Sequence, residues 1–223
     1  MKASVKHLAL VLMMFAVTLT ATAAPKDVSF TTADGAVIDA DLYGVGAHGV
    51  VFAHGAAFDK KSWAALARRL ADLGYRALAI DFRGYGKSRG GRNSRALDQD
   101  VLAAVRWLHA QGVSSVDVVG GSMGGGAAGQ AATEVRPGEI DKLVLLSPMP
   151  IAHPALLQAA SILYIASRDE SLAPTVRQQF AQAPQPKQLI LLDGRAHAQN
   201  IFATSQAQHL SDTIIQFLTS RKK

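Results

Sequence analysis

Hydrophobic and polar positions follow two patterns that alternate along most of this chain. One is a short, unbroken apolar run, as in residues 143–146, which is typical of a strand buried on both faces. The other places apolar residues three and four apart, as at Leu97, Val101, Val105 and Leu108, which indicates one buried helix face. The patterns predict strands at residues 28–32, 37–43, 49–53, 76–82, 115–120, 142–146, 161–166 and 188–192, and helices at residues 62–73, 94–110, 123–134, 155–159, 174–181 and 206–218.

Turn residues set the boundaries of these elements. Asp34-Gly35, between the first two strands, is a signal for a tight hairpin. Ser62 is expected to cap the first helix and Gly74 to end it. Strands that alternate with helices favour a mostly parallel sheet covered on both faces, here with an antiparallel hairpin at one edge. The predicted fold class is therefore α/β, with about eight strands in a single domain over residues 24–223.

The first 23 residues carry a separate pattern. Lys2 and Lys6 precede an apolar run over residues 8–19, and Ala21-Thr22-Ala23 supplies the small residues of a cleavage site. This order predicts a secretory signal peptide that is cleaved after Ala23, and hence a periplasmic or secreted protein. An uncleaved membrane anchor is the alternative, but the run is shorter than the roughly 20 residues that span a bilayer. We therefore expect no stable membrane insertion once the peptide is removed.

Composition limits the functions open to the chain. Its 223 residues are 49% hydrophobic and 18% charged, which suits a folded domain with a large core. The absence of cysteine excludes disulfides, a thiol nucleophile and thiolate metal sites. The formal charge of +6 is dispersed, whereas nucleic-acid binding needs a concentrated basic face, so no nucleic-acid partner is expected. No metal or other cofactor is expected either, because no group of histidines and carboxylates has ligand spacing.

The segment Gly120-Gly121-Ser122-Met123-Gly124 is the strongest candidate for chemistry. It has the form G-x-S-x-G and stands between a predicted buried strand and a predicted helix, the context of a nucleophile elbow. Such a turn exposes the serine hydroxyl at the edge of a sheet. The flanking glycines avoid collisions that a Cβ atom would cause in so sharp a bend. Ser122 is therefore the predicted nucleophile.

A serine needs a base to remove its proton and a carboxylate to orient that base, and with a nucleophile elbow these follow the serine in the order acid, then histidine. Asp169 comes just after the strand at 161–166, and His197 one short turn after the strand at 188–192. Because carboxyl ends of parallel strands share one edge, Ser122, Asp169 and His197 are the predicted catalytic triad. Glu170 is the alternative acid, whereas Asp193 is expected to start a turn.

The oxyanion of an acyl-transfer intermediate needs two backbone N–H donors. Met123 follows the nucleophile at a helix N-terminus and is the first predicted donor. The second should come from the loop after the strand at 49–53, where Ala56 is the predicted donor and Ala57 the alternative. His54, in the same loop, is expected to have a structural role.

These motifs together resemble the α/β-hydrolase superfamily over the whole chain after the signal peptide. The resemblance rests on His54-Gly55, on the Asp-x-Arg-Gly-x-Gly-x-Ser stretch at 81–88, on the Ser122 segment, and on Asp169 and His197. It implies that residues 81–88 mainly shape a loop beside the site. Residues 147–160 leave no room for the cap domain of many relatives. The chain is thus similar to small, cap-less esterases and dienelactone-hydrolase-like proteins.

A cap-less member is expected to have an open site for small or exposed esters. Its pocket would be lined by loop residues Ala57, Phe58, Tyr85 and Met149. The sequence therefore predicts an exported serine hydrolase that cleaves a small-molecule carboxylic ester through an acyl-enzyme. A peptidase or acyltransferase on the same triad and a non-catalytic binding protein with this fold are the alternatives.

Overall fold

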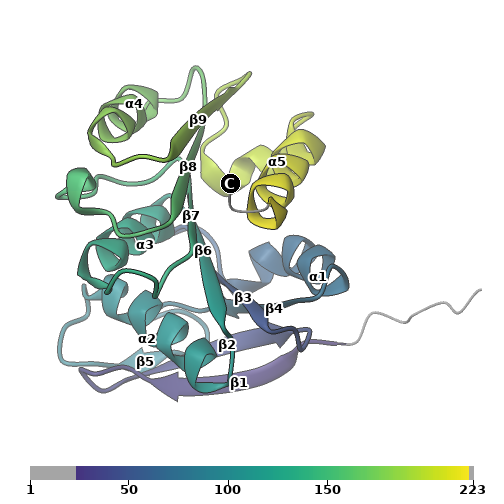
Figure 1. Ribbon diagram of the computed structural model, residues 1–223, viewed down its shortest axis with the longest axis vertical. Helices are drawn as coiled ribbons and strands as arrows, with labels where there is room; N and C mark the ends of the chain where they lie inside the picture. Colours follow the sequence, from purple (N-terminus) through teal and green to yellow (C-terminus); the bar gives the residue numbers. More distant parts are fainter. Residues whose placement is uncertain (1–23, 221–223) are drawn as a thin grey trace, which may run out of the picture.

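Nine strands join in a single sheet within residues 24–220, the part of the chain that the computed structural model describes (Figure 1). The signal peptide expected over residues 1–23 lies outside the described residues. The strands are β1 (Lys26–Thr31), β2 (Ala36–Tyr43), β3 (His48–Ala53), β4 (Tyr75–Ile80), β5 (Arg89–Gly90), β6 (Ser115–Gly121), β7 (Lys142–Leu146), β8 (Ser161–Ser167) and β9 (Lys187–Leu192).

The main sheet has the order β1-β2-β4-β3-β6-β7-β8-β9, and β5 pairs with β2 outside this path. β2 runs antiparallel to both β1 and β4, whereas β4, β3 and all later neighbours pair in parallel. The predicted mostly parallel sheet with an antiparallel hairpin at one edge is thereby confirmed. Since parallel strands end at the same edge, the loops after β3, β4, β6, β7, β8 and β9 gather there.

Helices cover both faces of the sheet (Figure 1): α2, α3 and α4 on one side, α1 and α5 on the other. None of the helices within residues 24–220 combines the length and the apolarity that a membrane crossing requires. The α-helices are α1 (Ala64–Asp72), α2 (Leu97–Ala110), α3 (Met123–Glu134), α4 (Ala173–Gln182) and α5 (Ala207–Thr219), and the 3₁₀ helices are η1 (Lys60–Trp63), η2 (Pro154–Leu156) and η3 (Ala198–Ala203).

Each face of the sheet has its own apolar core because strand side chains alternate between the faces. On β3, Val51 and Ala53 pack towards α2 and α3, whereas Val50 and Phe52 pack towards α1 and α5. All four side chains are fully buried. A strand buried on both faces reads as a continuous apolar run, which is why these strands could be identified from the sequence.

Some local expectations were wrong. Ser62 does not cap a helix: η1 comes first, and its Lys61 N–H donates to the Asp59 side chain at 2.9 Å. α2 begins at Leu97 rather than at Ser94. β5 and η3 were not predicted, since a two-residue strand and a 3₁₀ segment have too few residues to show a periodicity. Between β7 and β8, residues 147–160 hold only η2, so no large cap covers the site.

Candidate active site

The nucleophile elbow forms as the sequence predicted. Ser122 lies between β6 and α3 with φ 52° and ψ −115°, a conformation that a non-glycine residue adopts only under strain. A Cβ atom on Gly124 would lie 2.3 Å from the Ala53 carbonyl oxygen, and one on Gly120 would lie 2.4 Å from that of Gly124. The glycines therefore allow β6, α3 and β3 to approach closely enough to hold the strained serine.

The structure brings Ser122 and His197 together, as expected. His197 stands after β9, and its Nε2 lies 2.8 Å from the Ser122 Oγ. Its Nδ1 lies 2.5 Å from Oε2 of Glu170, whose side chain is only 1% exposed. A carboxylate accepts hydrogen bonds, so Nδ1 carries the proton and Nε2 is left to accept the serine hydroxyl proton.

Asp169, the predicted acid, is not in this chain of hydrogen bonds. The Glu170 N–H donates to the Ser167 carbonyl at 3.5 Å, so residues 167–170 form a tight turn whose two central residues, Arg168 and Asp169, are exposed. The turn directs the Glu170 carboxylate towards His197 and leaves Asp169 outside. The alternative acid, Glu170, therefore occupies the position expected for Asp169.

Two serines fix the Glu170 carboxylate. Its Oε1 accepts the Ser167 N–H at 2.9 Å and the Ser147 hydroxyl at 2.5 Å, which leaves Oε2 to His197. The Ser147 Oγ also accepts the N–H of Ala198 at 3.1 Å. Ser147 and Ala198 have φ values of 43° and 48°, so strained backbone occurs here as well as at the elbow. Ser147 was missed, although a polar residue directly after β7 lies at the edge where the site was sought.

The two predicted oxyanion donors are the backbone N–H of Met123, directly after Ser122, and that of Ala56, in the loop after β3. Met123 is the first residue of α3, so its N–H has no acceptor within the helix. In the loop after β3, Gly55 donates its N–H to Gln199 Oε1 at 2.6 Å, which leaves Ala56 as the next donor. The Tyr85 hydroxyl donates to the Ala56 carbonyl at 3.1 Å and so holds the peptide that follows this donor. A Cβ atom on Gly55 would lie 3.3 Å from that of Ser122, which shows how closely the loop approaches the serine.

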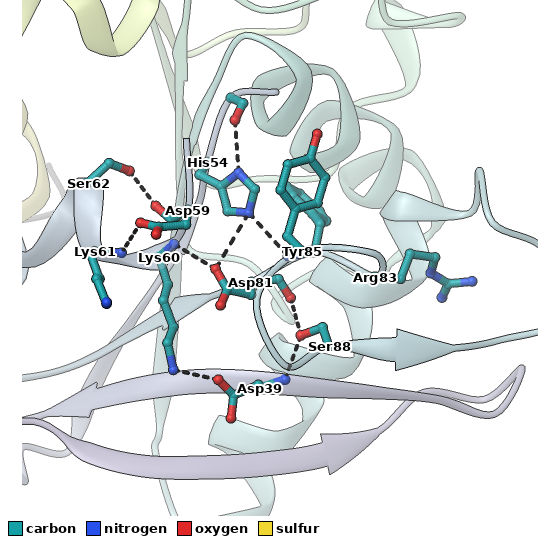
Figure 2. Close-up of polar contacts among 12 residues, drawn as sticks. Asp39, His54, Asp59, Lys60, Lys61, Ser62, Asp81, Arg83, Tyr85 and Ser88 are labelled. Atoms are coloured by element: carbon teal, nitrogen blue, oxygen red, sulfur yellow. Dashed lines mark hydrogen bonds and ion pairs between the residues drawn. The ribbon is translucent and has the colours of Figure 1, made fainter. Parts of the chain in front are cut away.

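Figure 2 shows His54 beneath this loop, where it acts as a structural residue. Its Nδ1 lies 2.9 Å from the Gly55 carbonyl, and the Phe82 N–H donates to its Nε2 at 3.2 Å. Both contacts require the neutral ring with the proton on Nδ1. Burial also lowers the pKa of His54, which favours the neutral form. With both ring nitrogens engaged, His54 is not available as a base.

An ion cluster anchors the far end of the same loop (Figure 2). The Lys60 N–H donates to Asp81 at 2.8 Å, and its buried ammonium lies 2.6 Å from Asp39 and 2.7 Å from Asp41. Burial by itself would lower the pKa of Lys60, but the two carboxylates outweigh it and raise the pKa. The loop is thus tied to β2 and to the end of β4.

The four predicted pocket residues lie in loops at this edge of the sheet. Met149 is 44% exposed, and its N–H donates to the Ser122 carbonyl at 3.0 Å. Tyr85 is half-buried, and its hydroxyl lies 3.8 Å from the Met123 sulfur. Ala57 is exposed and Phe58 half-buried in the loop after β3. Met149 therefore contacts Ser122 itself, and Tyr85 contacts its neighbour Met123.

A group of potential metal ligands lies elsewhere. Among the described residues, His48, Asp117 and Asp141 place one ligand atom each within 4.8 Å of one another. The sequence did not reveal this group, because its members come from three separate strand regions. His48 Nε2 already lies 3.0 Å from Asp117, which also accepts the Lys142 N–H at 3.0 Å. The group lies where β3 begins, at the edge opposite Ser122, so an ion held there would not reach the serine.

Comparison with curated proteins finds relatives with several activities. A dihydrolipoyllysine-residue acetyltransferase component of the acetoin cleaving system of Cupriavidus necator is 30% identical over 69% of this chain. A 2-hydroxy-6-oxononadienedioate/2-hydroxy-6-oxononatrienedioate hydrolase of Burkholderia vietnamiensis is 34% identical over 52% of it. The matches span 41% and 45% of those proteins, so the chain corresponds to less than half of either.

Solved structures share the fold more completely. An esterase of Pyrococcus furiosus matches with a TM-score of 0.72 and 22% identity, over 87% of this chain and 91% of that one. An enol-lactonase of Burkholderia xenovorans matches with a TM-score of 0.71 and 15% identity, over 86% and 100%. The model of the family described as alpha/beta hydrolase fold matches residues 50–210, which include the elbow, Glu170 and His197. This protein belongs to the alpha/beta hydrolase fold family.

Proposed function

We propose that this protein is an exported serine hydrolase that cleaves small carboxylic esters with Ser122, His197 and Glu170. The observation that carries the proposal is the continuous chain of hydrogen bonds from the Ser122 hydroxyl through His197 to Glu170. A serine on a strained elbow, a histidine in the base tautomer and a buried carboxylate are the parts that nucleophilic catalysis requires.

In the first half of the reaction, the Ser122 oxygen attacks the ester carbonyl while His197 Nε2 takes the hydroxyl proton. Glu170 stabilises the imidazolium that forms. The N–H groups of Met123 and Ala56 bind the oxyanion of the tetrahedral intermediate. The imidazolium then gives its proton to the departing alcohol, and an acyl-Ser122 ester remains.

The second half consumes water. The side chain of His197 is 34% exposed, and residues 147–160 form no cap above it. Water therefore reaches Nε2, loses a proton to it and attacks the acyl carbonyl, and the imidazolium then returns that proton to the Ser122 oxygen as the acid leaves. This openness favours hydrolysis over acyl transfer, since transfer needs water to be excluded from the acyl-enzyme.

A labelling experiment tests the proposal. A fluorophosphonate probe should label the wild-type protein at Ser122 and should not label Ser122→Ala. With p-nitrophenyl esters of increasing acyl length, the wild type should turn over the short esters, and His197→Ala should be slower by at least about 10³-fold. A wild type that neither labels nor hydrolyses any of these esters would instead favour a binding protein with this fold.

Export is proposed from the sequence pattern of residues 1–23. When the full-length chain is expressed in a bacterium, the periplasmic or culture-fluid protein should have a mass that starts at Ala24. A protein of full mass in the membrane fraction would indicate an uncleaved anchor.

A further inference from the structure

Gln199 is a buried side chain next to the candidate site to which the proposed mechanism gives no role. It belongs to η3, two residues after His197, and is 4% exposed. Its Oε1 accepts the Gly55 N–H at 2.6 Å, and its Nε2 donates to the Ser62 hydroxyl at 2.5 Å. Ser62 in turn donates to the Asp59 carbonyl (Figure 2). The side chain therefore joins the segment that carries the base to both ends of the loop after β3.

The orientation of the Gln199 amide follows from its partners. A backbone N–H can only donate, so the atom facing Gly55 must be the oxygen, and the nitrogen then faces Ser62. The packing leaves the amide little freedom to move. A Cβ atom on Gly121 would lie 3.0 Å from Oε1, and one on Gly55 would lie 3.2 Å from it.

The Gly55 contact decides which N–H groups remain for the oxyanion. With its N–H held by Gln199, Gly55 cannot turn this donor towards a substrate. The following peptide, which carries the Ala56 N–H, is then fixed from two sides, because its own carbonyl, that of Gly55, accepts from His54 Nδ1 at 2.9 Å and from the Phe58 N–H at 3.0 Å. Donors that are fixed before the charge develops stabilise the transition state most, since no reorganisation is needed during the reaction.

The same segment is fixed on its other side. Ala198, between His197 and Gln199, donates its N–H to the Ser147 hydroxyl, which itself donates to Glu170. The three consecutive residues thus contact the nucleophile, the surroundings of the acid and the oxyanion loop, in that order. A displacement of the loop after β3 would therefore displace His197 as well, and a displacement of His197 would move the loop.

We infer that Gln199 is a positioning residue that sets the Ala56 oxyanion donor relative to His197, an inference that rests on the proposed function. Gln199 does not touch the reacting atoms. Its loss should therefore weaken binding of the transition state much more than binding of the substrate.

Gln199→Met tests this inference, because methionine nearly conserves the volume and removes both hydrogen bonds. We expect kcat per active site, counted by fluorophosphonate titration, to fall about 10- to 100-fold with KM changed less than about 3-fold. A trifluoromethyl ketone forms a hemiketal with the serine whose oxygen carries the charge of the intermediate. Its Ki should rise by the same factor as kcat/KM falls. A purely structural role would lower the titrated fraction or the Tm without producing this parallel.

Two further variants complete the experiment. Ser62→Ala leaves the Gly55 contact in place and should reduce kcat less than Gln199→Met does. Gln208→Met, at an exposed position of α5, is the control and should match the wild type. A Gln199→Met protein with wild-type kcat per active site, or with reduced kcat but unchanged inhibitor affinity, overturns the inference while the proposed function stands. If the wild-type protein is neither labelled by the fluorophosphonate nor active on any ester, both the inference about Gln199 and the proposed function are wrong.

Discussion

Two adjacent carboxylates after β8 differ in their surroundings, and this difference gives the sharpest prediction for single residues. Glu170 is buried against His197, whereas Asp169 is exposed one residue earlier. Glu170→Gln should reduce kcat by about 10³- to 10⁴-fold, because a neutral amide no longer stabilises the imidazolium or fixes the base tautomer. Asp169→Asn should stay within about twofold of the wild type. Ester hydrolysis at pH 7.5 measures both.

The opposite pattern, in which Asp169→Asn is crippled and Glu170→Gln is active, would show that the turn at 167–170 rearranges in solution. A large loss in both variants would instead indicate that the turn itself, rather than one carboxylate, is needed. Fluorophosphonate titration of each variant counts the correctly folded sites.

Met149 provides the second prediction at this scale. Met149 is half-exposed and its backbone N–H binds the Ser122 carbonyl, so we expect a substrate acyl chain to cover its side chain. Removing that contact costs about 1 kcal/mol when half of a large apolar side chain is involved. Met149→Ala should therefore raise KM for p-nitrophenyl hexanoate about fivefold and leave p-nitrophenyl acetate unchanged. Val45→Ala, at an exposed apolar position before β3, is the control. Equal effects on both esters would place the acyl chain elsewhere.

The sequence predicted that Ser122 and His197 would come together but preferred Asp169 to Glu170 as the carboxylate beside them, for a physical reason. Ser122 is marked by glycines that the close approach of backbones requires, and His197 follows a strand with a clear apolar pattern. The choice between Asp169 and Glu170 depends on which residues occupy the middle of a four-residue turn. That is set by hydrogen bonds from Ser147 and Ser167, one of which comes from a distant strand end. Gln199 has no local signal either, since its partners come from the loop after β3.

At the scale of elements, the elbow depends on how closely α3 packs against β3. A Cβ atom on Gly124 would meet the carbonyl groups of Ala53 and His54 at 2.3 and 2.6 Å, whereas one on Gly126 would meet the Met149 Cβ at 3.0 Å. Gly124→Ala should thus lower the free energy of unfolding by about 3 kcal/mol or more, because backbone cannot move aside cheaply. Gly126→Ala should cost far less, since alanine also favours the helix by about 1 kcal/mol. Urea unfolding measures both. Equal stabilities of the two variants would mean that α3 can shift without cost.

The same scale shows where pattern reasoning works and where it fails. Strands β3, β6, β7 and β8 were located to within a residue, because each is buried on both faces and bounded by turn residues. Helix starts were less accurate: the pattern at 62–73 hides a change from 3₁₀ to α geometry at Trp63. Side-chain capping by Asp59, rather than by Ser62, depends on a loop conformation that no periodicity encodes.

Across the whole molecule, one buried guanidinium connects parts that are distant in sequence. Arg83, after β4, binds Asp34 in the hairpin turn between β1 and β2 with contacts of 2.7 and 2.9 Å. It also binds Asp100 of α2, which is fully buried, with contacts of 2.7 and 2.9 Å. The resemblance to the α/β-hydrolase superfamily implied that residues 81–88 mainly shape a loop beside the site. Arg83 holds that loop in its conformation by binding it to the β1–β2 hairpin and to α2.

This connection should make stability depend on pH in a way that Asp34→Asn removes. Hydrogen bonds from Arg83 hold the pKa of Asp34 well below its ordinary value. A lowered folded-state pKa stabilises the protein above the unfolded-state pKa of about 3.9, and this contribution is lost as the pH falls from there through the folded-state pKa. Asp34→Asn should therefore lower the free energy of unfolding by about 1 kcal/mol at pH 7, and the difference from the wild type should shrink by pH 3.

Asp72→Asn, at the exposed end of α1, controls for the change in net charge and should show no such convergence. A constant difference between Asp34→Asn and wild type from pH 7 to pH 3 in urea unfolding would mean that the Asp34 charge does not contribute, and that the hairpin is held by its backbone pairing with β4 and β5 alone.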